Sequence, residues 1–278
     1  MKIGCGTVVF RKFSLEEALG AIREAGFEYF ETQAVGPWCP HVDVERDDPE
    51  NLVKLKNKYG FREITGLWTL NGNLISNPDS VRAGILSVQW AAAAGIRIVH
   101  TGDGHKPKDM TDEDAFAILA ERLAAIAEEA KKLSVKLAVE PHGAFSLTAD
   151  GLKRILSVCG SDVLGVNYDP CNVFRASYVE SGGVWKDGGR GESESDVLKA
   201  VLPRVIHFHA KDIDKFKNCV ALGEGLVDLD TCLDILKAGG YRGAVSLETE
   251  GGDDLDAAKA LTKKSRDYLR SRLETERS

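Results

Sequence analysis

The sequence predicts an α/β fold, a single (β/α)8 TIM barrel over residues 1–278. Eight short apolar runs typical of strands alternate with eight helical patterns from end to end. No change in composition marks a second domain. The G-x-G-x-x-G motif that is typical of a doubly wound nucleotide-binding sheet does not follow the first strand. A chain of 278 residues can also bury a large core without disulfides or structural metal ions.

The first half of the chain supplies four strand–helix pairs. Strands are expected at residues 3–10, 27–32, 63–70 and 96–101. Ser14 and Glu17 form a capping box ahead of a helix whose apolar residues recur at helical spacing and which stops at Gly26. The other helices are expected at residues 48–59, 78–94 and 112–133, and a glycine follows the first two of them.

The second half repeats the alternation. Strands are expected at residues 135–140, 163–169, 205–209 and 244–248, and helices at residues 148–159, 195–202, 229–238 and 253–273. Residues 180–195 read ESGGVWKDGGRGESES and form a glycine-rich loop at the rim where barrel enzymes carry out chemistry. This loop is either a lid or a tolerated surface insertion.

Four strands of the second half end in a residue that can bind a metal ion. The runs KLAVE, LGVNYD, VIHFH and AVSLE end at Glu140, Asp169, His209 and Glu248. In a parallel barrel these strands are neighbours about 4.8 Å apart, and they end at one rim. Three carboxylates brought together there would repel one another unless a cation lay between them. Unrelated surface acids would instead fall at scattered positions along the strands, so we predict a divalent metal site.

The donor set narrows the choice of metal. Three carboxylates and one imidazole favour Mn²⁺, with Mg²⁺ or Co²⁺ also compatible, over a closed structural Zn²⁺ site, which would recruit cysteine. Four protein ligands would leave free positions on a six-coordinate ion, which two adjacent substrate oxygens could fill.

Net charge, cysteine spacing and apolar run length indicate which partners and which compartment to expect. The net charge of −7 disfavours nucleic acid and acidic membrane surfaces. None of the six cysteines forms a C-x-x-C pair, so we expect free thiols in a reducing compartment. No apolar run approaches transmembrane length, and the start MKIGCGTVVF resembles a strand more than a signal peptide. We therefore expect a cytoplasmic protein.

The segments VEPHG, NYDPCNV, HFHAKD, LGEG and SLETEG, in this order and at strand ends, resemble the xylose-isomerase-like barrel family. This family of sugar isomerases and epimerases includes ketose 3-epimerases, inosose dehydratases and endonuclease IV, and the resemblance spans essentially the whole chain. It implies the same four metal ligands. It also places Asn172 where the family often has histidine beside the metal site, and Lys215 where ketose 3-epimerases have arginine. Both departures argue against transferring ketose 3-epimerase specificity.

The resemblance implies a divalent-metal-dependent isomerase or epimerase acting on a keto-sugar or cyclitol. The metal would stabilise an enediolate, with Glu140 and Glu248 as acid and base on opposite substrate faces. The same enediolate could expel a neighbouring group, so a dehydratase or C-glycosyl lyase is the alternative, and a noncatalytic sugar-binding or accessory subunit is a third. Endonuclease activity would need more histidines at the mouth than this chain offers. Relatives are often dimers or tetramers, so a homo-oligomer is possible.

Further side chains are candidates for substrate contact. His142 lies two residues after Glu140 and therefore shares its side of the strand, while His207 and Lys211 flank His209. The remaining candidates are Glu31, Trp38, Trp68, His100 and His105. Packing or a solvated surface position is the alternative for each, and core packing is the commoner use of tryptophan.

Overall fold

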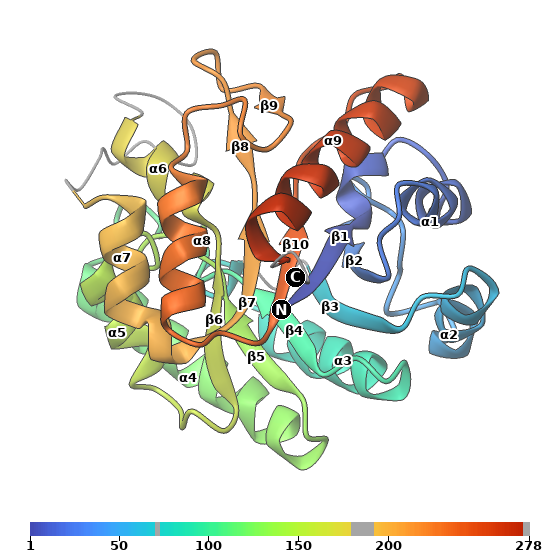
Figure 1. The fold of residues 1–278 in the computed structure, drawn as a ribbon. Coiled ribbons are helices and arrows are strands. Elements are labelled where there is room, and N and C mark those ends of the chain that lie inside the picture. The colour runs from blue at the N-terminus through green and yellow to red at the C-terminus, as the bar shows by residue number, and fades with distance from the viewer. Residues whose placement is uncertain (70–72, 179–191, 275–278) are drawn as a thin grey trace.

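The computed structural model is a closed barrel of eight parallel strands surrounded by helices, which confirms the predicted fold class (Figure 1). It describes residues 1–69, 73–178 and 192–274. The barrel strands are β1 (Lys2–Gly6), β2 (Tyr29–Ala34), β3 (Glu63–Thr69), β4 (Ile98–Thr101), β5 (Lys136–Val139), β6 (Leu164–Tyr168), β7 (Val205–Ala210) and β10 (Ala244–Leu247). Each strand pairs with its sequence neighbour in the barrel, and β10 closes the ring against β1. The predicted glycine-rich loop lies outside the described residues except for residues 192–195.

The helices follow the predicted order with small shifts at their ends. They are α1 (Leu15–Glu24), α2 (Pro49–Lys58), α3 (Ser80–Ala93), α4 (Asp112–Lys132), α5 (Ala149–Leu156), α7 (Glu194–Val201), α8 (Leu229–Ala238) and α9 (Leu255–Leu273). Ser14 and Glu17 make the reciprocal capping bonds that their spacing predicts. Gly26 follows α1 with φ +92°, a conformation that glycine adopts without the steric cost of a side chain.

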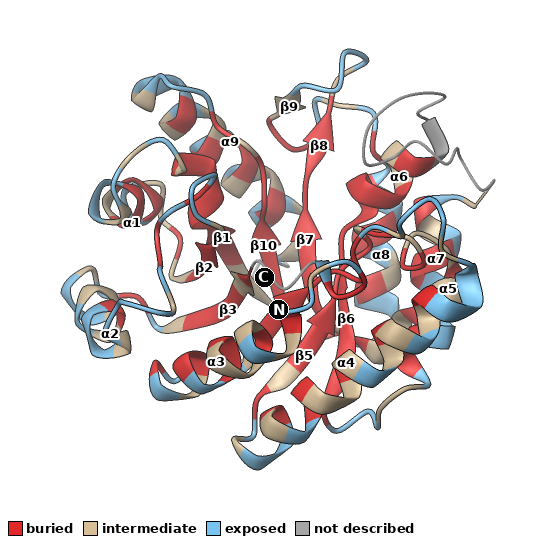
Figure 2. Ribbon diagram, turned by 180° about the vertical axis from the view of Figure 1, so that it is seen from behind, coloured by how far each residue is buried: buried red, intermediate tan, exposed pale blue. Residues whose placement is uncertain are grey.

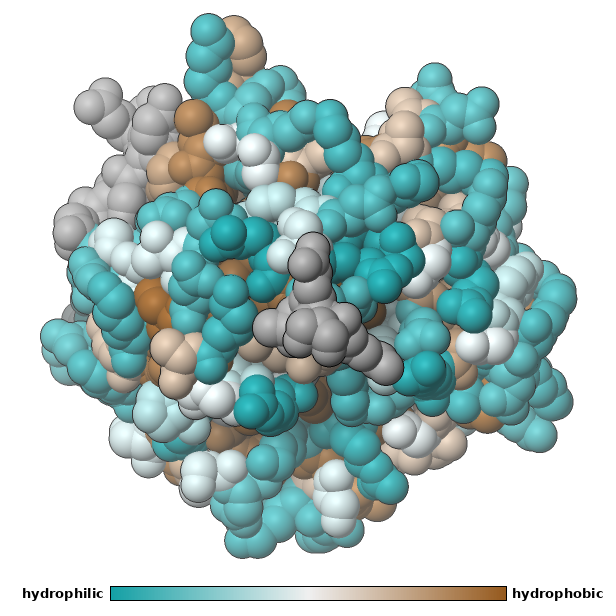
Figure 3. Space-filling view, in the orientation of Figure 1, coloured by the Kyte–Doolittle hydropathy of each residue, from teal (hydrophilic) through white to brown (hydrophobic). Residues whose placement is uncertain are grey.

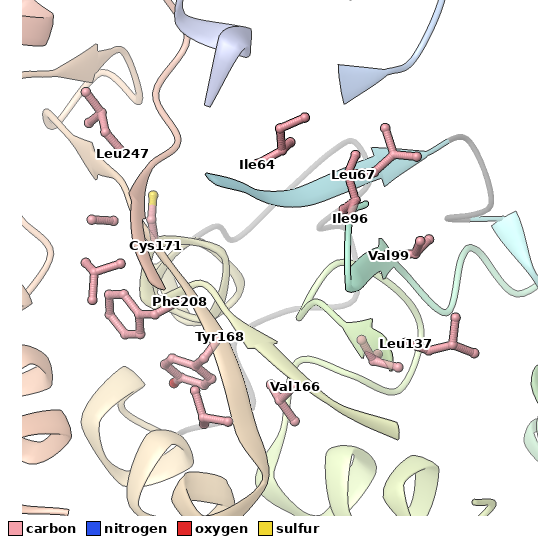
Figure 4. Packing of buried hydrophobic residues seen from close by; sticks show 14 of the residues in the cluster. Ile64, Leu67, Ile96, Val99, Leu137, Val166, Tyr168, Cys171, Phe208 and Leu247 are labelled. Atoms are coloured by element: carbon pink, nitrogen blue, oxygen red, sulfur yellow. The ribbon is translucent and has the colours of Figure 1, made fainter. Parts of the chain in front are cut away.

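The side chains of the barrel strands point alternately into the barrel and out toward the helices. Successive side chains point to opposite sides of a strand, so Phe208 points outward between the inward-facing His207 and His209. The outward apolar side chains pack under the helices and form the main core, part of which Figure 4 shows. The strands are buried almost throughout, whereas the outer helix faces are exposed (Figure 2). The barrel interior is polar, and its charged groups therefore need partners.

Three local elements differ from the sequence-based expectation. The predicted strand 3–10 ends at Gly6, because Thr7–Phe10 turns into a buried 3-10 helix. An unpredicted helix, α6 (Pro170–Tyr178), begins directly after Asp169. A short antiparallel pair, β8 (Asp212–Ile213) and β9 (Cys219–Val220), follows β7 and projects beyond the barrel (Figure 1).

The surface shows no hydrophobic belt in the view of Figure 3, where hydrophilic residues predominate. Within residues 1–69, 73–178 and 192–274, no helix combines the length and apolar character needed to cross a bilayer. All six cysteines lie in the described residues, and all are free thiols, as expected.

Candidate metal centre

The four predicted ligands converge at one end of the barrel. Ligand atoms of Glu140, Asp169, His209 and Glu248 all lie within 4.8 Å of one another, and all four side chains are buried. They come from or directly follow β5, β6, β7 and β10, which are consecutive around the barrel. Glu140 and Glu248 therefore stand at the two ends of the ligand arc.

Glu140 is held by several N–H donors. The Trp68 indole N–H donates to Oε2, and the Asn172 amide donates to Oε1 over 2.8 Å. Asn167 Nδ2 lies 3.4 Å from Oε2. Burial alone would raise the pKa of Glu140, but the charge and hydrogen bond of His209, together with His142 and Lys211, outweigh it and hold the pKa well below the usual range. This carboxylate is fixed in place and ionised.

Lys211 is the cation that faces the other two carboxylates. Its Nζ lies 3.1 Å from Asp169 Oδ2 and also contacts Glu248 Oε2, although neither oxygen accepts a well-aligned hydrogen bond. Burial raises the pKa of Glu248 to about 7, a rise that Lys211 and His209 only partly oppose. One lysine cannot neutralise three converging carboxylates, which is consistent with this raised pKa.

Glu31 contacts the His209 imidazole from inside the barrel. His209 Nε2 lies 2.9 Å from Glu31 Oε1, while its Nδ1 lies 3.6 Å from Glu140 and 4.0 Å from Glu248. Burial raises the pKa of Glu31, but His209, His207 and His100 together lower it to about 2, so the carboxylate is ionised and accepts the Nε2–H. That hydrogen bond leaves Nδ1 as the nitrogen that faces Glu140 and Glu248.

Two further histidines fill the barrel interior beside this pair. His207 Nδ1 bonds the Asn167 side-chain oxygen over 3.0 Å, and its Nε2 lies 3.3 Å from Glu31 Oε2. Burial lowers the pKa of His207 far below its usual range and that of His100 to about 4, so both rings are neutral. His100 fits because residue 66 is glycine: a Cβ there would lie 2.0 Å from His100 Nε2.

The donor set fits a divalent cation. Asp169 Oδ2 and Glu248 Oε2 are buried without a hydrogen-bond partner among the described residues, and His209 presents a ring nitrogen to the same space. Buried carboxylate oxygens in this state carry a large desolvation cost, which coordination to a hard cation offsets. The predicted ligand residues thus have the convergence and burial of a metal site, and Lys211 alone contacts two of its carboxylate oxygens without a well-aligned hydrogen bond among the described residues.

A cavity of about 250 Å³ opens beside the cluster. It is lined by Gln33, Val35, Trp38, Trp68, Glu140, His142, Asn172, Arg175, Lys211, Glu248 and Glu250. A larger hollow of about 630 Å³ lies at the opposite end of the strands, among residues such as Lys2 and Lys136. Barrel enzymes place their chemistry at the carboxyl ends of the strands, so the smaller cavity is the functional candidate.

The other residues singled out from the sequence divide into three groups. Five of them, Trp38, Trp68, His142, Asn172 and Lys211, line the cavity. Glu31, His100 and His207 are fully buried beneath the ligands. Lys215 and His105 are exposed, and neither is a lining residue of this cavity.

Asp103 is a positioning residue that the sequence did not reveal. Its buried carboxylate accepts hydrogen bonds from the backbone N–H of Ser146 over 3.1 Å and from the Ser146 hydroxyl over 2.6 Å. The same hydroxyl oxygen accepts the His142 backbone N–H over 2.9 Å. Asp103 thereby fixes the loop that presents His142 to the cavity. The sequence pattern also did not single out Arg175 or Gln33. Arg175 is in α6, a helix that was not predicted, and Gln33 lies just beyond the end of the expected strand 27–32.

Comparison with known proteins decides the family. The model of the family described as xylose isomerase-like TIM barrel matches residues 19–272. The chain belongs to this family. It is 27% identical over 270 residues to the L-ribulose-5-phosphate 3-epimerase UlaE of Escherichia coli (strain SMS-3-5 / SECEC), covering 92% of this chain and 89% of that protein. It is also 31% identical over 136 residues to the inosose isomerase of Halalkalibacterium halodurans, covering 45% of this chain and 43% of that protein.

Solved structures share the fold of this family member. The structure of L-ribulose 3-epimerase superposes with a TM-score of 0.76 at 21% identity, covering 99% of this chain and 95% of that one. The IOLI protein, whose crystal structure contains a bound zinc atom, superposes with a TM-score of 0.78 at 15% identity, covering 99% of this chain and 100% of that one. The recognised family and its barrel are thus confirmed.

Metal affinity should depend on pH. A cation would have to displace the protons of Glu248, with a pKa of about 7, and of His209, whose pKa is raised well above 6.5 because the charges of Glu31 and Glu140 outweigh the effect of burial. Each proton displaced below its pKa costs up to about tenfold in affinity per pH unit. We expect Mn²⁺ affinity to fall at least about tenfold from pH 8 to pH 6. Calorimetry in two buffers of different ionisation enthalpy would show the released protons, and equal affinity at both pH values would contradict this assignment.

Proposed function

We propose that this protein is a divalent-metal-dependent sugar isomerase or epimerase, with Mn²⁺ as the metal and a keto-sugar or cyclitol as the substrate. The observation that carries the proposal is the convergence of Glu140, Asp169, His209 and Glu248 within 4.8 Å beside a cavity of about 250 Å³. This volume lies just below the usual range for pockets that hold drug-sized ligands, which suits a single small sugar. Family membership supports the same reaction class.

The metal would be held by the four converging side chains, and when bound it supplies positive charge that stabilises the substrate oxygens as a C–H proton leaves. The protein's own contribution is proton transfer. Glu140 and Glu248 face the substrate position from the two ends of the ligand arc, so one removes a proton from one face of the carbon and the other returns a proton to the opposite face.

The two glutamates are held differently. Glu140 receives hydrogen bonds from Trp68 and Asn172, which keep its carboxylate oriented. Glu248 faces a lysine ammonium, and its Oε2 has no well-aligned donor among the described residues, so its carboxyl group is less restrained. Trp38 and Trp68 add apolar surface to the cavity wall, where the C–H faces of a sugar ring can pack.

Deuterium exchange would test the proposal. Mn²⁺-loaded protein would be incubated with a panel of ketoses, ketose phosphates and inososes in heavy water. We expect deuterium at the carbon next to the carbonyl, and product stereochemistry would separate epimerisation from isomerisation or elimination. Retention of Mn²⁺ without exchange into any panel member would instead favour the noncatalytic sugar-binding subunit.

A further inference from the structure

Arg175 is a cation at the cavity that is attracted by Asp169 and Glu250 but forms an ion pair with neither in the described structure. It projects from α6, the helix that follows Asp169, and it lines the cavity together with Asn172 and Lys211. The side chain is only partly exposed, and its Nε is buried without a hydrogen-bond partner among the residues that the structure describes. Among residues 1–69, 73–178 and 192–274, no carboxylate forms an ion pair with its guanidinium.

The neighbouring charges at the mouth are already paired. Lys211 contacts Asp169 and Glu248, so its ammonium is occupied by the ligand cluster. Glu250, the other acid that lines the cavity, lies 3.6 Å from Arg11. The Arg11 guanidinium in turn lies 4.9 Å from the centre of the Trp38 ring. These contacts leave Arg175 as the cation of the cavity wall that forms no ion pair within the described part of the chain.

A bound divalent cation would increase this mismatch. The three carboxylate ligands carry three negative charges, which the metal and Lys211 together balance. None of these three charges then remains for Arg175, and Glu31, the buried carboxylate beneath the ligands, pairs with His209 and forms no ion pair with Arg175 in the described structure. A partly buried guanidinium without a counter-ion costs free energy, whereas a bidentate contact with a carboxylate or phosphate is among the strongest hydrogen-bonded pairs in proteins.

The position of Arg175 indicates which part of a ligand it would meet. Asn172 and Arg175 are three residues apart on α6 and so share one side of the helix. Asn172 bonds the ligand residue Glu140, and Arg175 lies one helical turn further along. A group bound by Arg175 is therefore separate from the atoms that approach the metal ligands.

We propose that Arg175 binds an anionic group of the substrate, a carboxylate or a phosphate, so that the substrate is an acidic or phosphorylated sugar rather than a neutral one. This inference deepens the proposed function and rests on it, because the bound compound is a substrate only if the protein catalyses the proposed reaction. The binding site itself is testable without turnover, because matched polyols lack the carbonyl group that the reaction needs.

The test is equilibrium binding of xylitol, xylitol 5-phosphate and xylonate to Mn²⁺-loaded protein, measured by calorimetry. We expect at least one of the two anions to bind about 10–100-fold more tightly than xylitol, the range for a charge-assisted contact. Tighter binding of xylitol 5-phosphate alone would identify a sugar phosphate, and that of xylonate alone a sugar acid. Arg175→Met should reduce this preference to less than about twofold, and Arg175→Lys should restore part of it.

Arg62→Met is the matched control, since Arg62 is exposed and pairs with Glu28 away from the cavity. It should retain the wild-type preference. Equal binding of all three compounds by the wild type, or an unchanged preference in a folded, Mn²⁺-loaded Arg175→Met protein, would overturn the inference. Deuterium exchange into neutral ketoses with no anion preference would leave the proposed function standing and refute this inference alone. Anion binding that depends on Arg175, with no deuterium exchange into any ketose, would support this inference and contradict the proposed function.

Discussion

Glu248→Gln should reduce proton exchange into the substrate by about 10²–10⁴-fold, the usual contribution of a positioned acid–base group. The amide that replaces the carboxylate cannot accept the substrate proton, although its oxygen can still face the metal position. The measurement is deuterium incorporation at saturating Mn²⁺, with the metal content of the variant determined on the same sample. The fold should survive, because Glu248 is at the cavity and its Oε2 has no well-aligned hydrogen bond to lose.

Glu63→Gln provides the matched control for this experiment. Glu63 is at the opposite end of the barrel, where it bonds Lys2 over 2.8 Å, and its substitution should leave exchange unchanged. Near-normal exchange in Glu248→Gln would remove Glu248 from the catalytic role. Loss of exchange together with loss of bound Mn²⁺ would assign Glu248 to metal binding instead. The same two measurements on Glu140→Gln would then separate metal binding from proton transfer at the other end of the arc.

Mn²⁺ should stabilise the protein strongly, and Asp169→Asn should remove most of that gain. Binding that is confined to the folded state adds about 2.7 kcal/mol to the free energy of unfolding at a ligand concentration 100 times Kd. For a chain of this size the melting temperature should rise by about 5 °C. Asp169 supplies an oxygen that is buried and has no well-aligned donor, so an amide in its place would weaken coordination directly.

Thermal melts with Mn²⁺ and with EDTA would measure this effect. Asp162→Asn is the control, since Asp162 is exposed at the other end of β6 and pairs with Lys131 over 3.3 Å. The control should show the full Mn²⁺-dependent shift. An equal shift in Asp169→Asn would mean that the cation binds elsewhere on the protein.

The convergence of the four side chains could be predicted because strand periodicity and strand ends coincide. Glu140, Asp169, His209 and Glu248 each stand at a strand end, and a parallel barrel aligns those ends at one rim. The same period-two reasoning places His142 beside Glu140. These positions follow from local pattern and fold class together, and neither alone would bring the four side chains within 4.8 Å.

Features that depend on contacts across the barrel could not be predicted in this way. The role of Glu31 depends on β2 facing β7 through the barrel interior, where Glu31 meets a histidine 178 residues away in sequence. The segment PCNVFRASY lacks a clear helical period, so α6 was not predicted and Arg175 was missed with it. The apolar run before Arg11 matches a strand in composition, but Thr7–Phe10 is buried as a 3-10 helix. Lys215 lies in an exposed turn after β8, with its Nζ 5.0 Å from the centre of the Phe216 ring. The family resemblance alone could not predict this position.

A crystal of the protein grown with Mn²⁺ tests the central claim most directly, through the anomalous difference density of the metal. We expect a single strong peak about 2.0–2.4 Å from carboxylate oxygens of Glu140, Asp169 and Glu248 and from Nδ1 of His209. A map with no peak among these four side chains, at a Mn²⁺ concentration that saturates the protein in solution, would contradict the assignment of this cluster as the metal centre.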